Sequence, residues 1–320
     1  MPTHSRKPYR GYLYIATATF FWGISATLGR AAFTGRLLPG GEALRPIDSL
    51  ILSQSRATFS FLVLLPVLLI SRRGPSLRLA KRDILQAALL GVFGIALSNY
   101  FYYLAIQRAN VATAITLQYT APVWVLMYAI ARKQQKFTLK RMAAVGLALA
   151  GIALVIDAFG AGGLRLNGPG VIPALLASFS FAFYNIGGHS ILARYSRWTV
   201  LLYTIGTASL FWIFVNSPWK IAAAHYSGGQ WLFLLFFSLL SVLAPFSLYF
   251  AGLQHLEPTR AIVVSCLEPV FSIVIAAVAL GEVMRPLQTL GIVLVLAAIL
   301  LVQKPEQRTD EPVAVIEPVD

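Results

Sequence analysis

One acidic residue of this chain lies in the middle of a long apolar segment, where an ionisable side chain is unusual. Glu268 falls within the apolar stretch 259–280 and directly precedes Pro269. Hydrocarbon disfavours a charged carboxylate, so a carboxyl group there is suited to taking up and releasing a proton near neutral pH. Ser265, Glu268 and Ser272 recur at helical spacing and form one small polar face. This face predicts a substrate cavity with a coupling carboxyl group, or else a structural glutamate bonded to a neighbouring helix.

Polar side chains mark other apolar segments in the same way. Gln118 and Pro122 share a helical face in the segment 111–131, and a buried amide needs hydrogen-bond partners. Pro122 and Pro269 each free a backbone carbonyl in mid-segment, which predicts helix breaks or hinges. The residues predicted to line a substrate cavity are Trp22, Asn99, Tyr102, Gln118, Tyr119, Asn185, Ser265 and Glu268. For Gln118, a role in joining helices is the alternative.

Two further ionisable side chains lie in apolar segments. His189 is a second candidate for proton coupling because imidazole titrates near neutral pH, although its place close to a segment end also fits a solvated interface residue. Arg56 lies about two helical turns into the segment 49–70. Its long side chain is expected to extend outward to the membrane surface, and binding of a carboxylate is the alternative.

The shortage of charge identifies the environment of these residues. Of 320 residues, 58% are hydrophobic and 12% are charged, whereas a soluble protein has about 25% charged residues. Lys and Arg number 26 against 12 acids, but the basic residues occupy short breaks between apolar segments, so a nucleic-acid partner is not expected. The single cysteine, Cys266, and four scattered histidines provide no disulfide, metal site or cofactor site. The expected environment is a lipid bilayer.

Ten apolar segments are long enough to cross that bilayer as helices. They are residues 11–33, 49–70, 84–106, 111–131, 142–160, 170–192, 199–217, 231–253, 259–280 and 286–303. Segments such as 292–302 are apolar on every side, which excludes the alternating pattern of a β-barrel. The predicted fold is therefore an all-α polytopic membrane protein with ten transmembrane helices.

The placement of Lys and Arg predicts the orientation. Seventeen of them lie in the segments 1–10, 71–83, 132–141, 193–198 and after 303, which fall on one side of the membrane if ten spans alternate. Six lie on the other side, and they are Arg36, Arg45, Arg108, Arg165, Lys220 and Arg285. Because basic loops stay in the cytoplasm, both termini are predicted to be cytoplasmic.

An internal repeat relates the two halves of the chain. At a shift of 147 residues, seven of the 28 positions in 102–129 are identical, including the pairs Gln107 with Gln254 and Pro122 with Pro269. Each half holds five predicted spans, and five is odd, so the second half enters the membrane inverted. Inverted repeats are typical of secondary transporters whose substrate site lies at the midplane between the halves.

Several short motifs resemble those of the EamA-type drug/metabolite transporter superfamily. They are Leu117–Val123, Leu267–Phe271 leading to Leu280-Gly281-Glu282, Phe21-Trp22-Gly23, Arg56 and the last span with Gly291. The resemblance implies an inner-membrane exporter of small organic metabolites, often amino acids or drug-like compounds, with cytoplasmic termini. One departure is that Gly281-Glu282 has no counterpart after the fourth span, where Ala131-Arg132-Lys133 stands.

The sequence thus divides into a cytoplasmic segment 1–10, a five-helix repeat 11–160, a second five-helix repeat 170–303 and a disordered acidic tail 304–320. The predicted function is secondary active export by alternating access, with proton coupling through Glu268. A passive channel and an intramembrane enzyme acting on lipids are the alternatives, and the enzyme would need a nucleophile or metal motif that the sequence lacks. A monomer is one form compatible with the sequence.

Overall fold

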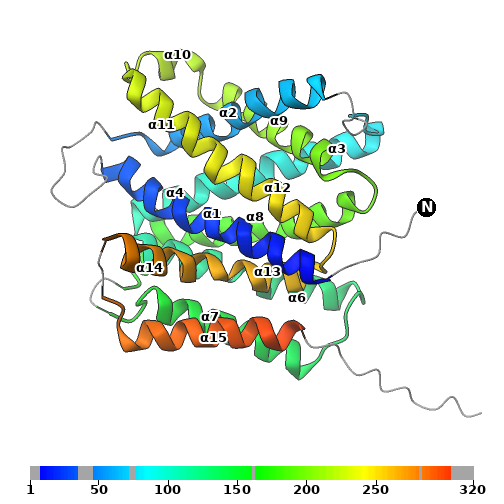
Figure 1. Ribbon diagram of the computed structural model, residues 1–320, viewed down its shortest axis with the longest axis vertical. Coiled ribbons are helices and arrows are strands. Elements are labelled where there is room, and N and C mark those ends of the chain that lie inside the picture. The colour runs from blue at the N-terminus through cyan, green and yellow to red at the C-terminus, as the bar shows by residue number, and fades with distance from the viewer. Residues whose placement is uncertain (1–7, 35–45, 72–76, 161–162, 281–282, 304–320) are drawn as a thin grey trace, which may run out of the picture.

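The computed structural model describes residues 8–34, 46–71, 77–160, 163–280 and 283–303, and its regular elements are all helical (Figure 1). The elements are α1 Pro8–Thr34, α2 Ser49–Ile70, α3 Lys81–Leu89, η1 Leu90–Ala96, α4 Leu97–Arg108, α5 Val111–Gln118, α6 Ala121–Ala131, α7 Leu139–Val155, α8 Gly168–Leu192, α9 Arg197–Val215, α10 Pro218–Ala222, α11 Gly228–Ser238, η2 Leu239–Leu243, α12 Ala244–Leu253, α13 Pro258–Ser265, α14 Leu267–Leu280 and α15 Pro286–Gln303. The elements η1 and η2 are π-helical turns.

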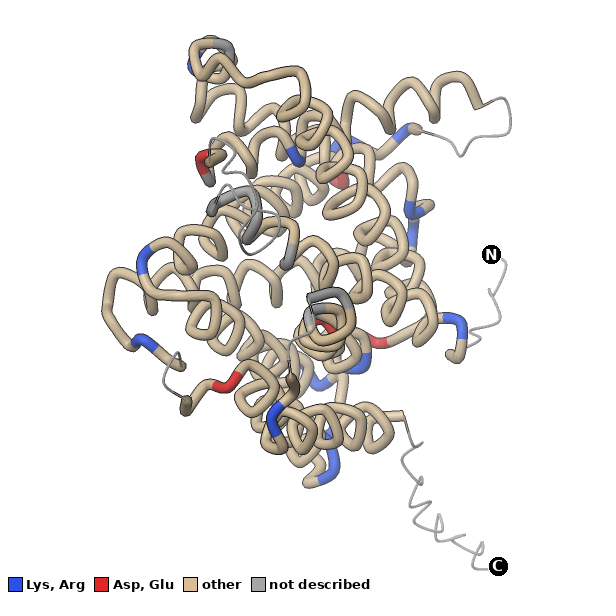
Figure 2. The backbone as a smooth tube through the Cα atoms, turned by 60° about the vertical axis from the view of Figure 1, so that its left-hand side comes forward, with Lys and Arg blue, Asp and Glu red and all other residues tan. Residues whose placement is uncertain are grey.

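The helices lie roughly side by side, and the start of α1 and the end of α15 meet the same face of the molecule (Figure 1). We call this face the terminal face. Charged positions gather at helix ends and in connections, with long uncharged stretches between them (Figure 2). This distribution is the one expected for helices whose middles lie in hydrocarbon, because a charged side chain at the bilayer centre costs about 2.5–3.5 kcal/mol.

Eight helical stretches among the described residues are long and apolar enough to cross a membrane. They are Leu50–Ile70, Lys81–Arg108, Val111–Ala131, Gly168–Leu192, Arg197–Val215, Gly228–Leu253, Pro258–Ile275 and Pro286–Gln303. The predicted first and fifth spans correspond to α1 and α7, which fall outside this set, α7 with 17 residues. The prediction of a multi-pass all-helical membrane protein is thus confirmed.

Polar residues in the connections determine where several helices begin. The Asp48 carboxylate accepts a hydrogen bond from the backbone N–H of Leu50 at 2.8 Å, and Asn110 caps α5 through the N–H of Thr113 at 2.8 Å. Such side chains satisfy backbone donors that the first helical turn leaves unpaired. α1 begins at Pro8, three residues before the predicted start, and the short helix α10 lies in a connection where no helix was predicted.

The element bounds repeat along the chain at the same interval as the sequence. Adding 147 to the bounds of α5 gives those of α13, and the same shift carries α7 onto α15 within one residue. The π-helical turn η1 shifts onto 237–243, the range that contains η2. A π-helical turn is rare, so its recurrence at matched positions is a stronger sign of internal repetition than the amino-acid identities.

Two of the long helical stretches are broken near the middle. The first break lies between α5 and α6 at Tyr119 and Thr120, and the second lies between α13 and α14 at Cys266. Each break is followed within three residues by a predicted break residue, Pro122 or Pro269. A proline fits the first turn of a new helix because its missing N–H would have no partner there.

The broken helices pack in two groups. α8 packs against η1, α4, α5 and α6, whereas α1 packs against α12, α13 and α14. We call α3, η1, α4, α5, α6 and α8 the α8 group, and α11, η2, α12, α13, α14 and α1 the α1 group. Each group therefore combines helices from both halves of the sequence.

The pair α7 and α15 lies together at one edge of the molecule (Figure 1). Gly151 and Gly291 make this contact close, because a Cβ atom on Gly151 would lie 2.8 Å from the Gly291 carbonyl oxygen. Small residues at such crossings let helix backbones approach closely in membranes. The predicted tail 304–320 and the motif residues Gly281 and Glu282 lie outside the described residues.

Candidate functional site

A cavity of about 610 Å³, its open mouth included, lies between the two groups. Helices α1, α2, α4, α5, α8, α12 and α14, together with η1, contribute to its wall. Six of the predicted cavity residues come together here, and they are Trp22, Asn99, Tyr102, Gln118, Tyr119 and Glu268.

Arg56 is also part of this wall, which corrects the expectation that it extends outward to the membrane surface. The residue is 5% exposed, and its guanidinium group is held inside the protein. Nε donates to Ser241 Oγ at 2.8 Å, and Nη2 donates to the Ser241 carbonyl oxygen at 3.0 Å. Nη1 donates to Asn99 Oδ1 at 3.1 Å and to the Tyr103 hydroxyl at 2.5 Å. Outward extension is unnecessary because these partners replace water around the buried cation.

Aromatic rings complete the surroundings of this cation. The Arg56 guanidinium carbon lies 5.3 Å from the ring centre of Tyr103 and 5.4 Å from that of Phe237. Both distances are within the range of cation–π attraction, which strengthens when the cation is desolvated. The cavity wall therefore carries a rigidly positioned positive charge.

Glu268 faces the same cavity from the first turn of α14. The Tyr119 hydroxyl donates a hydrogen bond to Glu268 Oε2 at 2.7 Å, and the Ser265 carbonyl oxygen lies 3.1 Å from that hydroxyl. Tyr119 comes from the break between α5 and α6, so the two helix breaks meet at this contact. The cavity thus holds a guanidinium and a carboxyl group, each bonded to separate neutral partners.

A glycine brings α1 up to the backbone beside Glu268. A Cβ atom on Gly23 would lie 3.0 Å from the Ser272 nitrogen and 3.2 Å from the Glu268 carbonyl oxygen. Trp22, the preceding residue, then projects into the cavity wall. The Phe21-Trp22-Gly23 motif therefore positions the tryptophan by allowing close backbone contact.

A cluster of aromatic rings in edge-on and tilted contact closes the cavity toward the terminal face. The Trp22 ring centre lies 5.3 Å from those of Phe246 and Tyr249, and Phe181 lies 6.1 Å from both Trp22 and Tyr249. α12 runs toward the terminal face, so the fully buried Tyr249 lies beyond Phe246 in that direction. These rings form an apolar floor below the charged groups.

Three predicted site residues lie outside the cavity wall. Asn185 is fully buried and accepts a hydrogen bond from the Tyr249 hydroxyl at 2.6 Å. Ser265 is also buried, and its hydroxyl donates to the Ile262 carbonyl oxygen at 2.7 Å. His189 lies near the terminal face, where its Nδ1 is 3.0 Å from the Leu253 carbonyl oxygen.

Sequence reasoning missed Tyr103 and Ser241, which hold Arg56 in place. Tyr103 was visible as a neighbour of Tyr102, but its hydroxyl could be assigned to Arg56 only once the two helices were placed together. Ser241 is one of several polar residues in the mostly apolar run of α11, η2 and α12. Ser241 lies in the π-helical turn η2, and the sequence contains no signal for that turn.

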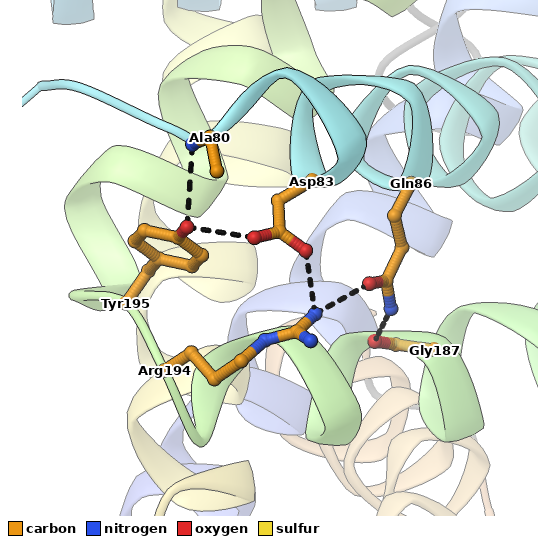
Figure 3. Close-up of polar contacts among 6 residues, drawn as sticks. All are labelled: Ala80, Asp83, Gln86, Gly187, Arg194 and Tyr195. Carbon is orange, nitrogen blue, oxygen red and sulfur yellow. Dashed lines mark hydrogen bonds and ion pairs between the residues drawn. The ribbon is translucent and has the colours of Figure 1, made fainter.

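A second polar cluster, none of whose residues lines the cavity, joins α3 to α8 (Figure 3). Asp83 of α3 accepts from the Tyr195 hydroxyl at 2.7 Å and pairs with Arg194 Nη2 at 2.9 Å. Gln86 accepts from the same Arg194 nitrogen at 2.7 Å and donates to the Gly187 carbonyl oxygen at 3.2 Å. The cluster ties α3 to the end of α8 and to the connection that follows it.

The fold and the cavity define a multi-pass helical membrane protein with a polar site buried between two groups of helices. The profile of the EamA-like transporter family matches residues 9–157 and again residues 168–303. The chain belongs to the EamA-like transporter family.

Proteins similar to the chain are named as transporters. It is 24% identical to an uncharacterized inner membrane transporter, YicL, of Salmonella typhimurium, over 93% of this chain and 97% of that one. It is 28% identical to the threonine/homoserine exporter RhtA of Escherichia coli, over 69% of this chain and 72% of the other. The fold is also similar to that of a protein of known crystal structure, with a TM-score of 0.73 and 18% sequence identity. The match covers 92% of this chain and 96% of the other chain, and at this identity it supports the fold alone.

Proposed function

We propose that this protein is a secondary active exporter of small zwitterionic metabolites, with α-amino acids as the principal class. The observation that carries the proposal is the presence of Arg56 and Glu268 in the wall of one cavity. A zwitterion carries a carboxylate and an ammonium group, and the cavity offers one group of opposite charge for each of them. Arg56 and Glu268 do not form an ion pair with each other. Their hydrogen bonds go instead to neutral partners, which are Ser241, Asn99, Tyr103 and Tyr119.

Arg56 is the group that binds the substrate carboxylate. A guanidinium has five N–H donors, and four are directed at Ser241, Asn99 and Tyr103. These bonds fix the orientation of the group, and the remaining Nη2 donor is available to a ligand. Its positive charge has no carboxylate partner among the described residues, so an anionic ligand group gains both a hydrogen bond and charge compensation.

Glu268 is the group that binds the substrate ammonium or the coupling proton. Tyr119 donates to Oε2, and Oε1 remains for a ligand. When the carboxyl group is ionised it attracts an ammonium group, and when it is protonated this attraction is lost. Competition between proton and substrate for one carboxyl group is a simple way to couple their opposite movements.

Alternating access follows from two inverted halves of five spans each. The proposal is supported by the repetition of element bounds at 147 residues and by the two separate matches of the family profile. Similar halves of opposite orientation give an inward-open and an outward-open form of comparable energy. We assign the terminal face to the cytoplasm because 17 Lys and Arg residues belong to that side in the ten-span arrangement.

The relatives agree with this substrate class and location. RhtA is named as a threonine/homoserine exporter, and both of those substrates are zwitterionic amino acids. YicL is named as an inner membrane transporter, which matches a cytoplasmic membrane location. We therefore take amino acids as the first compounds to test.

The test is counterflow into proteoliposomes that contain the purified protein. Labelled L-threonine and L-phenylalanine are compared with phenethylamine, which lacks the carboxylate, and with 3-phenylpropionate, which lacks the ammonium. We expect saturable uptake of the amino acids that is stimulated by the same compound on the opposite side. Transport without such stimulation would indicate a channel, and equal transport of all phenyl compounds would contradict recognition of a zwitterion.

A further inference from the structure

The two groups of helices contact each other differently at the two ends of the cavity. Toward the terminal face, α6 of the α8 group packs against α13 of the α1 group, and α8 packs against α12. Toward the opposite face, α5 and α14 continue the same two broken helices. Within the described part of the chain, α5 and α14 make no comparable packing contact. The protein is therefore closed at its terminal face.

The cavity position agrees with this asymmetry. Arg56 lies closer to the start of α2 than to its end, and Tyr102 and Tyr103 lie in the half of the stretch Lys81–Arg108 that leads away from the terminal face. Ser25 likewise lies beyond Trp22 on α1 in that direction. The polar lining thus occupies the middle and the opposite half of the molecule, above the aromatic floor.

A polar bridge joins the two groups at the closed end. Gln135, in the connection after α6, donates from Nε2 to Glu257 Oε2 at 3.1 Å. The Thr259 hydroxyl donates to Gln135 Oε1 at 3.0 Å, so both atoms of the amide are used. Glu257 and Thr259 belong to the N-terminus of α13 in the α1 group. A second link is the contact of His189 on α8 with the Leu253 carbonyl oxygen at the end of α12.

We infer that Gln135, with Glu257 and Thr259, forms the gate at the terminal face and that the structure is the form open to the opposite face. The inference rests on the proposed alternating access. Opening of the terminal side must separate α6 from α13. Among the described residues, the side-chain amide of Gln135 forms two hydrogen bonds, and both cross the boundary between α6 and α13. These bonds favour the form closed at the terminal face.

The internal repeat identifies the contact that replaces this one in the other form. A shift of 147 residues carries α6 onto α14 and α5 onto α13. Exchanging the roles of the two halves converts the α6–α13 contact into a contact between α14 and α5. The terminal-side pair Ala131 and Pro258 corresponds to the pair Val278 and Val111 at the opposite end.

The polar cluster in Figure 3 holds α3 and α8 together, so that the α8 group moves as one unit. Asp83 and Gln86 of α3 bind Arg194, Tyr195 and the Gly187 carbonyl oxygen, which belong to α8 and the residues that follow it. All of these bonds lie on one side of the α6–α13 boundary. Consequently α3 and α8 stay together when the gate opens.

Spin labels measure both ends of the cavity in one protein. In a Cys266→Ala background, one sample carries labels at Ala131→Cys and Pro258→Cys, and another carries labels at Val278→Cys and Val111→Cys. Electron paramagnetic resonance of the full-length protein in lipid is expected to give a short distance for the first pair and a long one for the second.

Gln135→Ala removes the bridge, and Gln134→Ala, at the neighbouring exposed position, is the matched control. We expect Gln135→Ala to raise the ratio of terminal-open to terminal-closed molecules about tenfold, the ratio that corresponds to ~1.4 kcal/mol. The first distance should lengthen as the second shortens, and Gln134→Ala should leave both distances unchanged. Unchanged distances in Gln135→Ala, or both distances moving in the same direction, would overturn the gate.

The distances also separate this inference from the proposed substrate class. If the protein transports no amino acid but the two distances still exchange in Gln135→Ala, the gate holds and the substrate assignment fails. If counterflow of amino acids is normal and the distances do not respond, the substrate class holds and the gate fails.

Discussion

Replacing Arg56 with glutamine is expected to lower the export of zwitterionic substrates without a comparable effect on amines. The wild-type guanidinium offers a substrate carboxylate one unoccupied donor and a charge that forms no direct ion pair among the described residues. A hydrogen bond to a charged group contributes about 1.5–3 kcal/mol. Its loss corresponds to a decrease of roughly 10- to 150-fold in kcat/KM for an amino acid. Arg56→Lys keeps the charge but not the planar fork and should give an intermediate value.

The assay compares counterflow of L-phenylalanine and phenethylamine in the same proteoliposomes. Arg56→Gln also disturbs Ser241, Asn99 and Tyr103, and such a disturbance would lower the transport of both compounds. The ratio of the two rates therefore isolates the carboxylate contact from a change in the fold. Arg108→Gln, at the exposed end of α4, is the control and should leave the ratio unchanged. An equal fall for both compounds in Arg56→Gln would refute carboxylate binding by Arg56.

Three further outcomes are expected. Glu268→Gln should reduce amino-acid export at least about tenfold and abolish its dependence on a proton gradient, because the amide neither ionises nor attracts an ammonium group. The control Asp48→Asn should transport normally, since asparagine caps a helix as well as aspartate. A normal response to the proton gradient in Glu268→Gln would exclude proton coupling through Glu268. Gly151→Ala should lower the free energy of unfolding by about 1–3 kcal/mol through overpacking against α15. Gly146→Ala in the same helix, with open space around it, should be neutral or stabilising by up to about 1 kcal/mol. Thermal unfolding in detergent compares the two variants, and equal effects would contradict the close crossing of α7 and α15. Asp83→Asn should lower the free energy of unfolding by only about 1 kcal/mol, because the partner in its ion pair, Arg194, is half exposed. This loss should vanish in a protein that already carries Arg194→Gln. A loss of the same size in that background would show that the ion pair contributes nothing to stability.

Much of the helical framework was predictable because each span has to satisfy a local rule. A chain in hydrocarbon must pair its own backbone groups, so long apolar segments become helices wherever they occur. Helix breaks near Pro122 and Pro269 were likewise predictable, since proline lacks the N–H that a continuous helix needs. The π-helical turns were not predictable, because the sequence contains no signal for them; in the structure η1 packs against α8 and α9, and η2 packs against α1 and α2.

The candidate site was predictable in part, because a polar residue in an apolar span needs a partner and therefore stands out. Glu268 and Gln118 stand out because polar residues are rare in these spans, and both line the cavity. Asn185 and Ser265 had the same signal, yet they satisfy their hydrogen bonds inside the protein and away from the cavity. A residue type indicates a need for a partner, and only the packing determines whether this partner is a protein atom or a ligand.

The sequence by itself determined the membrane environment and the all-helical class, since these depend on composition and on spacing along the chain. Only the tertiary structure decided the role of Arg56. In sequence it is one arginine on one helix, and its long side chain permits either outward extension or burial. Ser241 lies 185 residues away along the chain and supplies two of the acceptors that make burial favourable. Desolvation of a cation is offset by partners in space, and those partners exist only after the helices have packed.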